Sequence, residues 1–209
     1  MITPAIAGGK CAGRLAARLA RHESHPWPAA ANACETAEVR LQCRFMDTTE
    51  TNPALTRLFS ELVDGASAQA GAFILNSGDV GLLRSLDRIS AEDASRSAND
   101  GATIAAHAEH LRYGLSLMNR WANEGGNPFA DATWDEAWKM SDVDAPAWKA
   151  IRDGLRDEAH RWLKTLSSPR HVSDVELTGM IASIAHLAYH LGAIRQISKA
   201  GRGPREGTF

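Results

Sequence analysis

The spacing of apolar residues is the sequence feature that most constrains the fold. From residue 52 onward, apolar side chains recur at intervals of three and four in four stretches, residues 52–63, 104–118, 148–166 and 180–194. This spacing gives each stretch one apolar face when it is helical. The first stripe can extend as far as Ile74 and Leu75, but Gly65 and Gly71 weaken it and leave its end open. Because no stretch alternates with a period of two and no long internal repeat is present, the sequence predicts an all-α four-helix bundle. A long crossover connection is expected between helices two and three.

Three of the four stretches are preceded by residues that favour a helix start. Asn52 stands directly before a proline, and Asp144 stands two residues before another. A capping side chain followed by a proline in the first turn is typical of a helix N-terminus. Ser173, with Glu176 three residues later, has the pattern of a capping box. Residues 82–89 predict a further, shorter helical piece.

The connection after the second helix is unusually long. We expect the second helix to run from near Asp100 to about Trp121, so that the connection covers residues 122–144 and carries Trp134 and Trp138. Connections of this length in a compact domain often form part of a binding site. The two tryptophans could wall such a pocket, although residues of this kind more often cap the core.

Composition and charge exclude several classes of protein. The chain has 209 residues, of which 44% are apolar, enough for a sizeable core. Its formal net charge is −2 and its pI about 6.4, so it lacks the basic surface that nucleic acids or anionic membranes attract. No run of 18 apolar residues is present, which predicts no membrane-spanning segment. We therefore expect a cytoplasmic protein with neither nucleic acid nor membrane as partner.

The two ends of the chain differ from its middle. All three cysteines, Cys11, Cys34 and Cys43, lie within the first 45 residues. We predict that residues 1–45 are a poorly ordered N-terminal extension or the result of an upstream start codon, with an amphipathic targeting peptide as the alternative. Residues 46–198 are predicted to form the four-helix metal-binding domain, and residues 199–209 a flexible C-terminal tail.

Four histidines occur in pairs on two of the predicted helices. His186 and His190 are four residues apart, so they stack on one helix face close enough to bind one ion. His107 and His110 lie three residues apart on the second predicted helix. Either could supply a third ligand while the other supports it, and we favour His107 because it is better centred on the apolar stripe.

Other interpretations of these residues are weaker. A single buried histidine is more often hydrogen-bonded within a core than bound to a metal. However, burying several unpaired polar groups costs roughly 1–3 kcal/mol each, and two helically spaced pairs in one domain favour a metal. The Glu-x-x-His motifs of di-iron bundles are absent, as are His-Glu-x-x-His and Cys-x-x-Cys. The sequence assigns no catalytic residue; Glu109 and Tyr189 are predicted to face away from the metal, and Tyr113 is the better candidate.

Two segments resemble a known family. Residues 103–111 (TIAAHAEHL) and 186–194 (HLAYHLGAI), together with the tryptophan-rich chain after the second helix, resemble the DinB/YfiT-like superfamily. The resemblance covers about residues 50–198. It implies an up-down-down-up bundle that holds a divalent metal, most often zinc or nickel, through His107, His186 and His190. The chain departs from the family at Ala193, where many relatives have glutamine, and in its additional His110.

The resemblance also implies what such a site does. Family members with known activities include thiol-dependent S-transferases and a mycothiol-dependent isomerase, and many members are homodimers. Three protein ligands leave one coordination position open, which is typical of catalytic metals. We expect a metal-dependent transferase that uses a low-molecular-weight thiol, or a hydrolase, acting on a small-molecule substrate. The alternative is a non-catalytic helical bundle that serves as a binding or dimerisation module.

Overall fold

The computed structural model describes residues 45–67, 71–98 and 100–204. Apart from Phe45, the predicted N-terminal extension and its three cysteines lie outside these residues, as do residues 205–209. The described part is mostly helical, as an all-α protein should be. Its elements are β1 (Met46–Asp47), α1 (Asn52–Asp64), α2 (Gly81–Asp87), α3 (Ala91–Ala94), α4 (Ile104–Glu124), α5 (Trp134–Trp138), α6 (Ala145–Ser167), β2 (His171–Val172), α7 (Asp174–Ile197) and the 3-10 turn η1 (Lys199–Gly201).

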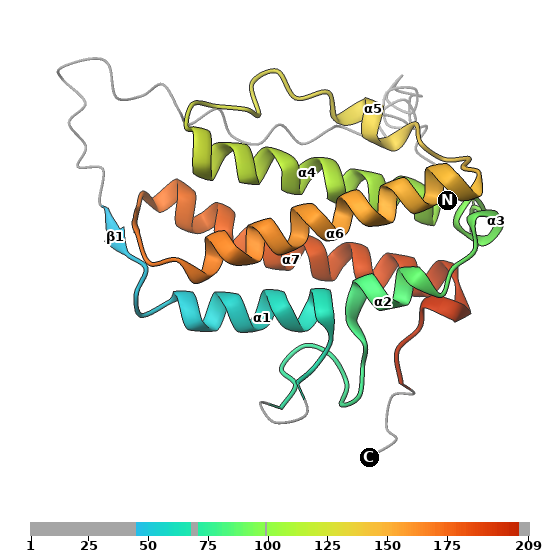
Figure 1. Ribbon diagram of the computed structural model, residues 1–209, viewed down its shortest axis with the longest axis horizontal. Helices are drawn as coiled ribbons and strands as arrows, with labels where there is room; N and C mark the ends of the chain where they lie inside the picture. Colours follow the sequence, from blue (N-terminus) through green and yellow to red (C-terminus); the bar gives the residue numbers. More distant parts are fainter. Residues whose placement is uncertain (1–44, 68–70, 99, 205–209) are drawn as a thin grey trace, which may run out of the picture.

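Four helices, α1, α4, α6 and α7, lie side by side along the long axis of the molecule (Figure 1). Both α1 and α4 contact α6, and both contact α7. Across the middle, the Trp162 indole N–H of α6 donates a hydrogen bond to the Ser183 hydroxyl of α7 at 2.9 Å. The four helices therefore enclose one shared core.

The directions of these helices follow from the contacts at one end of the molecule. There β1, which precedes α1, pairs antiparallel with β2, which precedes α7. The Arg170 guanidinium, just beyond α6, donates a hydrogen bond to the Ala122 carbonyl in the last turn of α4 at 3.2 Å. Hence α1 and α7 begin at this end, while α4 and α6 finish there (Figure 1).

The predicted helix starts agree with the structure in two cases and differ in two. The Asp144 carboxylate caps α6, and Ser173 and Glu176 form the full capping box of α7. The prediction that Asn52 caps the first helix is wrong: Thr51 occupies that position, and Asn52 is the first helical residue with a buried, unpartnered amide. The second long helix begins later than expected because the Thr103 hydroxyl caps it by accepting from the Ala106 N–H.

The first helix ends where a backbone conformation requires glycine. Gly65 follows α1 with φ of +100°, and a Cβ atom there would lie 2.4 Å from the carbonyl oxygen of Asp79. L side chains rarely adopt this conformation, and the close contact leaves no room for one. The apolar stripe therefore does not continue as a helix to Ile74 and Leu75.

The core is one cluster between the four long helices, and its largest fully buried side chains include two tryptophans. The Trp148 indole N–H donates to the Ile89 carbonyl at 2.7 Å, so this buried polar group is satisfied. The other large side chains that are fully buried are Trp162, Phe59, Leu62, Leu82, Leu86, Ile104, Leu111, Leu117, Leu155, Leu166 and Met180. The predicted stripes thus supply the core residues of α1, α4, α6 and α7.

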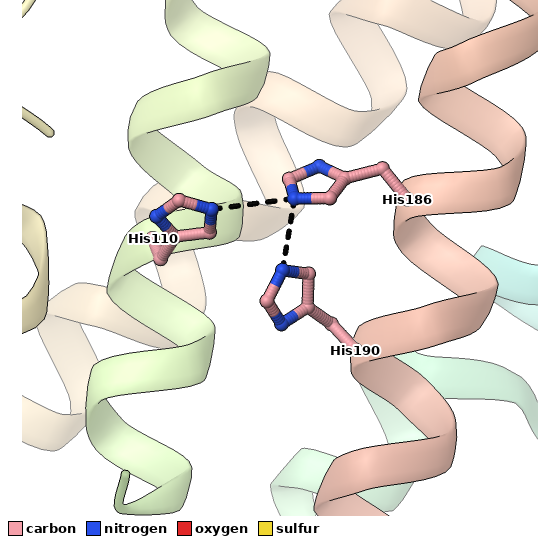
Figure 2. A group of neighbouring side chains, drawn as sticks. All are labelled: His110, His186 and His190. Carbon is pink, nitrogen blue, oxygen red and sulfur yellow. Dashed lines mark hydrogen bonds between the residues drawn. The ribbon is translucent and has the colours of Figure 1, made fainter. Parts of the chain in front are cut away.

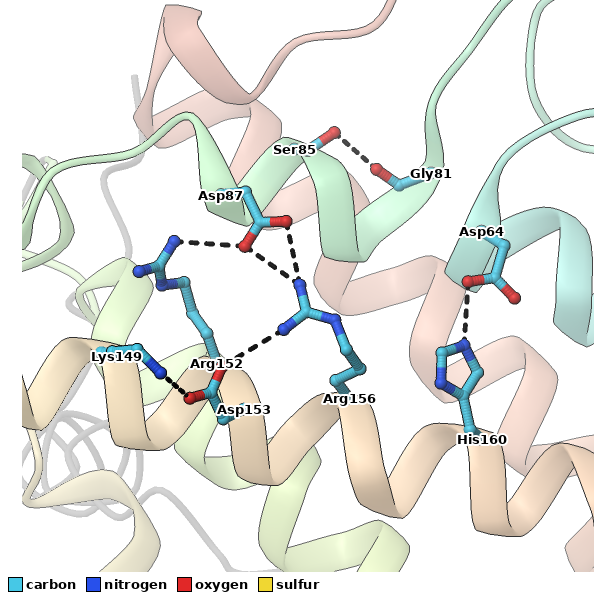
Figure 3. Close-up of polar contacts among 9 residues, drawn as sticks. All are labelled: Asp64, Gly81, Ser85, Asp87, Lys149, Arg152, Asp153, Arg156 and His160. Carbon is cyan, nitrogen blue, oxygen red and sulfur yellow. Dashed lines mark hydrogen bonds and ion pairs between the residues drawn. The ribbon is translucent and has the colours of Figure 1, made fainter.

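Charged side chains connect α2 to α6 at the surface (Figure 3). The Asp87 carboxylate accepts from Arg152 at 3.1 Å and from Arg156 at 2.9 Å, and Asp153 pairs with Lys149 and Arg156. Exposed ion pairs of this kind contribute about 0–1 kcal/mol each. They orient α2 on α6 more than they stabilise the fold.

A buried carboxylate organises the loop after α1. Glu61 is 4% exposed, and its carboxylate accepts hydrogen bonds from the backbone N–H groups of Phe73, Ile74 and Leu75 at 2.6–3.1 Å. A charged acceptor strengthens such bonds. Glu61 therefore holds this loop in one conformation, although the apolar stripe gave no indication of the role.

We expect Glu61→Gln to destabilise the protein by about 1.5–3 kcal/mol, because charge-assisted hydrogen bonds of this kind contribute that much. Urea unfolding gives the free energy, and hydrogen exchange should become faster at the amides of residues 73–75. The exposed Glu50→Gln is the matched control and should leave both quantities unchanged. Unaltered exchange at residues 73–75 in the Glu61 variant would contradict this role for the carboxylate.

The first residues of the predicted C-terminal tail pack against the domain. Residues 199–201 form η1, and Gly201 is buried beside Ile89 and Ile194. Within the same region, the Arg195 guanidinium forms a 2.7 Å ion pair with Asp79, which is 3% exposed. The charge and glycine content predicted a segment outside the fold, but a glycine is small enough to fit here.

Among the described helices, α7 is long and apolar enough to cross a membrane by length and composition alone. The core helix of a soluble protein passes the same test. The sequence itself predicts no spanning segment, because it lacks a continuous apolar run, and a cytoplasmic location stays a prediction.

Candidate metal centre

Four histidines from two helices converge between α4 and α7. His107 and His110 come from α4, and His186 and His190 come from α7. Because the two helices run in opposite directions, the earlier histidine of one faces the later histidine of the other. His107 accordingly lies against His190, and His110 lies against His186.

Three of these histidines lie close enough together to hold a metal ion: His110, His186 and His190 (Figure 2). The Nε2 atom of His186 is 3.3 Å from Nε2 of His110 and 2.9 Å from Nε2 of His190. One ligand atom from each of the three residues falls within 4.8 Å of the other two. The group thus directs the nitrogens of three separate rings to one point.

The predicted ligand set was His107, His186 and His190. The structure brings the last two together but places His107 beside them, with its Nδ1 atom 2.8 Å from Nδ1 of His190. His110, the alternative that the sequence left open, lies in the group of three. That His107 is itself a ligand stays a prediction.

Three of the four histidines are buried, whereas His186 is more exposed. His107 and His110 are each 8% exposed and His190 is 2% exposed, so His186 is the most accessible of the four. Burial lowers the pKa of His107 and of His186. Burial, reinforced by the neighbouring histidines, lowers the pKa of His110 to about 4 and that of His190 to about 2. At neutral pH all four rings are neutral, the form in which imidazole binds metals.

Tryptophans of the long connection cover the histidines. The short helix α5 places the ring of Trp138 in a stacked arrangement on His110, with centroids 4.3 Å apart, and edge-on to His107 at 5.4 Å. Trp134 contacts His110 at 5.5 Å. Of the two roles that the sequence left open for these tryptophans, walling a pocket or capping the core, the structure places them along the α4 side of the histidine group.

The other residues considered for the site have different surroundings. Glu109 forms an ion pair with Arg112 at 2.5 Å and is not among the grouped ligands. Tyr189 is 71% exposed, and its ring meets His190 edge-on at 5.0 Å. The Tyr113 hydroxyl accepts from the Thr133 N–H at 2.8 Å, so it is engaged by the connection. No polar contact links these three side chains to the histidines.

A polar cavity of about 210 Å³ lies further along the same face of α4. Its lining residues are Tyr113, Leu117, Arg120, Glu124, Gly125, Asn127, Pro128 and Asp131. Tyr113 follows His110 by one turn and meets the edge of Trp134 at 5.5 Å. Trp134 therefore contacts both a residue of the cavity wall and His110.

The lowered pKa values predict loss of stability in acid. In the unfolded chain each histidine takes up a proton near pH 6.5, whereas folded His110 and His190 stay neutral until far lower pH. We expect the metal-free protein to lose stability as pH falls from 6.5 toward 4, by about 1.4 kcal/mol per pH unit for each of these two residues. Urea midpoints at pH 7.5, 6.0 and 5.0 measure this. His186→Ala/His190→Ala should flatten the dependence, and an unchanged midpoint in the wild type would contradict it.

Comparison of the chain with protein-family models, with curated proteins and with solved structures finds no match.

Proposed function

We propose that this chain is a DinB/YfiT-like protein that binds one divalent metal through His110, His186 and His190 and uses it to activate a thiol or a water molecule against a small-molecule substrate. The observation that carries this proposal is the convergence of three imidazole nitrogens from α4 and α7. Zinc and nickel are the metals that the family resemblance implies.

The helix arrangement supports the family assignment. Since α1 and α7 run one way while α4 and α6 run the other, the order along the chain is up-down-down-up. We interpret the four helices as a four-helix bundle, with residues 125–144 as the crossover between its second and third members. The histidines also occur on the bundle helices that the resemblance names, the second and the fourth.

The donor set fits a divalent ion. Imidazole nitrogens are suitable ligands for zinc and nickel. Cysteine thiolates also bind these metals, but residues 46–198 contain no cysteine. Ligand nitrogens about 2.0–2.1 Å from a tetrahedral zinc lie roughly 3.3 Å from one another. The Nε2 atom of His186 is 3.3 Å and 2.9 Å from its two neighbours, which is close to that spacing. We assign His110 rather than His107 as the third ligand for this reason.

Three protein ligands leave a position open for catalysis. When bound, the ion would lower the pKa of a thiol or water placed at that position. The surrounding residues supply the environment: Trp138 and Trp134 exclude water on the α4 side, and His186 marks the more accessible side. The thiol that we propose is a separate low-molecular-weight compound, and the absence of cysteine from residues 46–198 is compatible with this.

The substrate would bind near the connection. The cavity beside Tyr113 is lined by charged and amide side chains, including Arg120, Glu124 and Asn127. Such a lining suits a small polar molecule, and Trp134 contacts both Tyr113 of the cavity wall and His110.

The test combines metal content with turnover. The full chain, purified without a metal-binding tag, should contain about one zinc or nickel per chain and should transfer a thiol to an electrophile or hydrolyse an ester. His186→Ala/His190→Ala should lose both properties. Stoichiometric metal without turnover over a broad panel of thiols and electrophiles would favour the non-catalytic binding module instead.

A further inference from the structure

The ring of His190 is contacted on both of its nitrogens. Its Nε2 atom belongs to the group of three ligands, 2.9 Å from Nε2 of His186. Its Nδ1 atom lies 2.8 Å from Nδ1 of His107, on a buried hydrogen bond. Neither His110 nor His186 has a comparable partner among the described residues; Nδ1 of His110 is buried without one.

A neutral imidazole ring has one protonated nitrogen and one nitrogen with a free lone pair, and it binds a metal through the latter. If Nε2 of His190 faces the ion, the single proton of its neutral ring must be on Nδ1. That proton then points at His107 over 2.8 Å, so His107 must accept it on Nδ1 and carry its own proton on Nε2. A metal on Nε2 of His190 therefore requires His190 to be the donor of this hydrogen bond and His107 its acceptor.

We propose that His107 is a positioning residue, not a ligand: it accepts the Nδ1 proton of His190 and so holds that ring in the tautomer and orientation that bind metal. This inference rests on the proposed function, because it requires a metal at the group of three. Partners of this kind orient ligand rings in metal sites and raise the basicity of the ligand.

The packing around His107 supports this role. The ring of Trp138 meets His107 edge-on at 5.4 Å with an angle of 81° between planes, and it also stacks on His110. The rings of His107, Trp138 and His190 therefore pack against one another in a group of three, with centroids 5.1–5.8 Å apart. If His107 were a ligand, one of its nitrogens would have to join the Nε2 atoms of His110, His186 and His190. Its Nδ1 atom instead faces Nδ1 of His190, the ring nitrogen that points away from those atoms.

Two substitutions separate the hydrogen bond from the packing. His107→Asn keeps an acceptor oxygen near the position of Nδ1 but removes the ring. His107→Phe keeps a ring against Trp138 but offers no acceptor. In chelator competition with zinc on the full chain, we expect the phenylalanine variant to bind about 10–100-fold more weakly than wild type, and the asparagine variant to stay within about threefold of it.

A measurement on the wild type does not depend on how the variants fold. Nitrogen-15 NMR of the zinc-loaded full chain should show His190 protonated on Nδ1, with that proton protected from exchange with water. In His107→Phe the same proton should exchange faster.

Four outcomes would contradict the inference. If both variants lose zinc as fully as His186→Ala/His190→Ala, His107 is a ligand. If both bind zinc like the wild type, or if only the phenylalanine variant does, the hydrogen bond does not position His190. A His190 proton on Nε2 in the zinc-loaded wild type would overturn the inference while leaving the metal site in place. Failure of the wild type to bind zinc would instead overturn the proposed function itself.

Discussion

The double variant His186→Ala/His190→Ala should bind zinc at least about 10³-fold more weakly than the wild type. Four-ligand zinc sites bind with about 10–16 kcal/mol, so each ligand contributes on the order of 3 kcal/mol when the total is shared equally. Removing two of the three proposed ligands, which both come from α7, leaves His110 as the one remaining member of the group. Chelator competition or isothermal titration calorimetry measures the difference.

The chain offers a matched control for this experiment. His160 and His171 are exposed and lie away from the group: His160 pairs with Asp64 at 3.0 Å, and His171 belongs to β2. His160→Ala/His171→Ala also removes two imidazole side chains, but it should bind zinc like the wild type. Equal zinc affinity in the two double variants would place the metal elsewhere in the protein.

The second large effect concerns the contact between α6 and α7. Trp162 is 1% exposed, and its indole N–H donates to Ser183 across the core. Truncating a buried aromatic side chain leaves a cavity, which costs about 3–5 kcal/mol. We expect Trp162→Ala to lower the free energy of unfolding by this amount. It should also lower zinc affinity, because α7, which carries the Ser183 partner of Trp162, also carries His186 and His190.

Two further variants define the cause. Trp162→Phe should lose less stability than the alanine variant, because it retains most of the packing and gives up the hydrogen bond to Ser183. Ile181→Ala removes an apolar side chain from the exposed face of α7, where it is 53% exposed, and should change stability by less than about 0.5 kcal/mol. A loss below about 1 kcal/mol for Trp162→Ala in urea unfolding would show that the core does not depend on this residue.

Much of the helical structure could be predicted because long elements leave redundant signals. The stripes of α6 and α7 extend over more than four turns, and each begins with a side chain that caps its first N–H groups. Such signals reinforce one another. By contrast, α5 has five residues and β1 and β2 have two each. Elements this short are set by contacts with the rest of the chain, which a local pattern does not record.

The candidate site shows the same limit at the level of single residues. His186 and His190 lie on one helix, so their spacing alone places them together. His107 and His110 are one turn apart, and both face α7. The register between α4 and α7 decides which of them meets the Nε2 atoms. Register depends on packing between helices far apart in sequence, so the sequence favoured His107 on its more central position in the apolar stripe.

The most direct test of the central claim is X-ray absorption fine structure of the zinc-loaded full chain. A metal held by three histidines with one open position predicts three imidazole nitrogens at about 2.0 Å and one oxygen from solvent. The same spectrum from His186→Ala/His190→Ala should lose the imidazole scattering. A fourth imidazole or a sulfur ligand in the wild type would contradict the open three-histidine site.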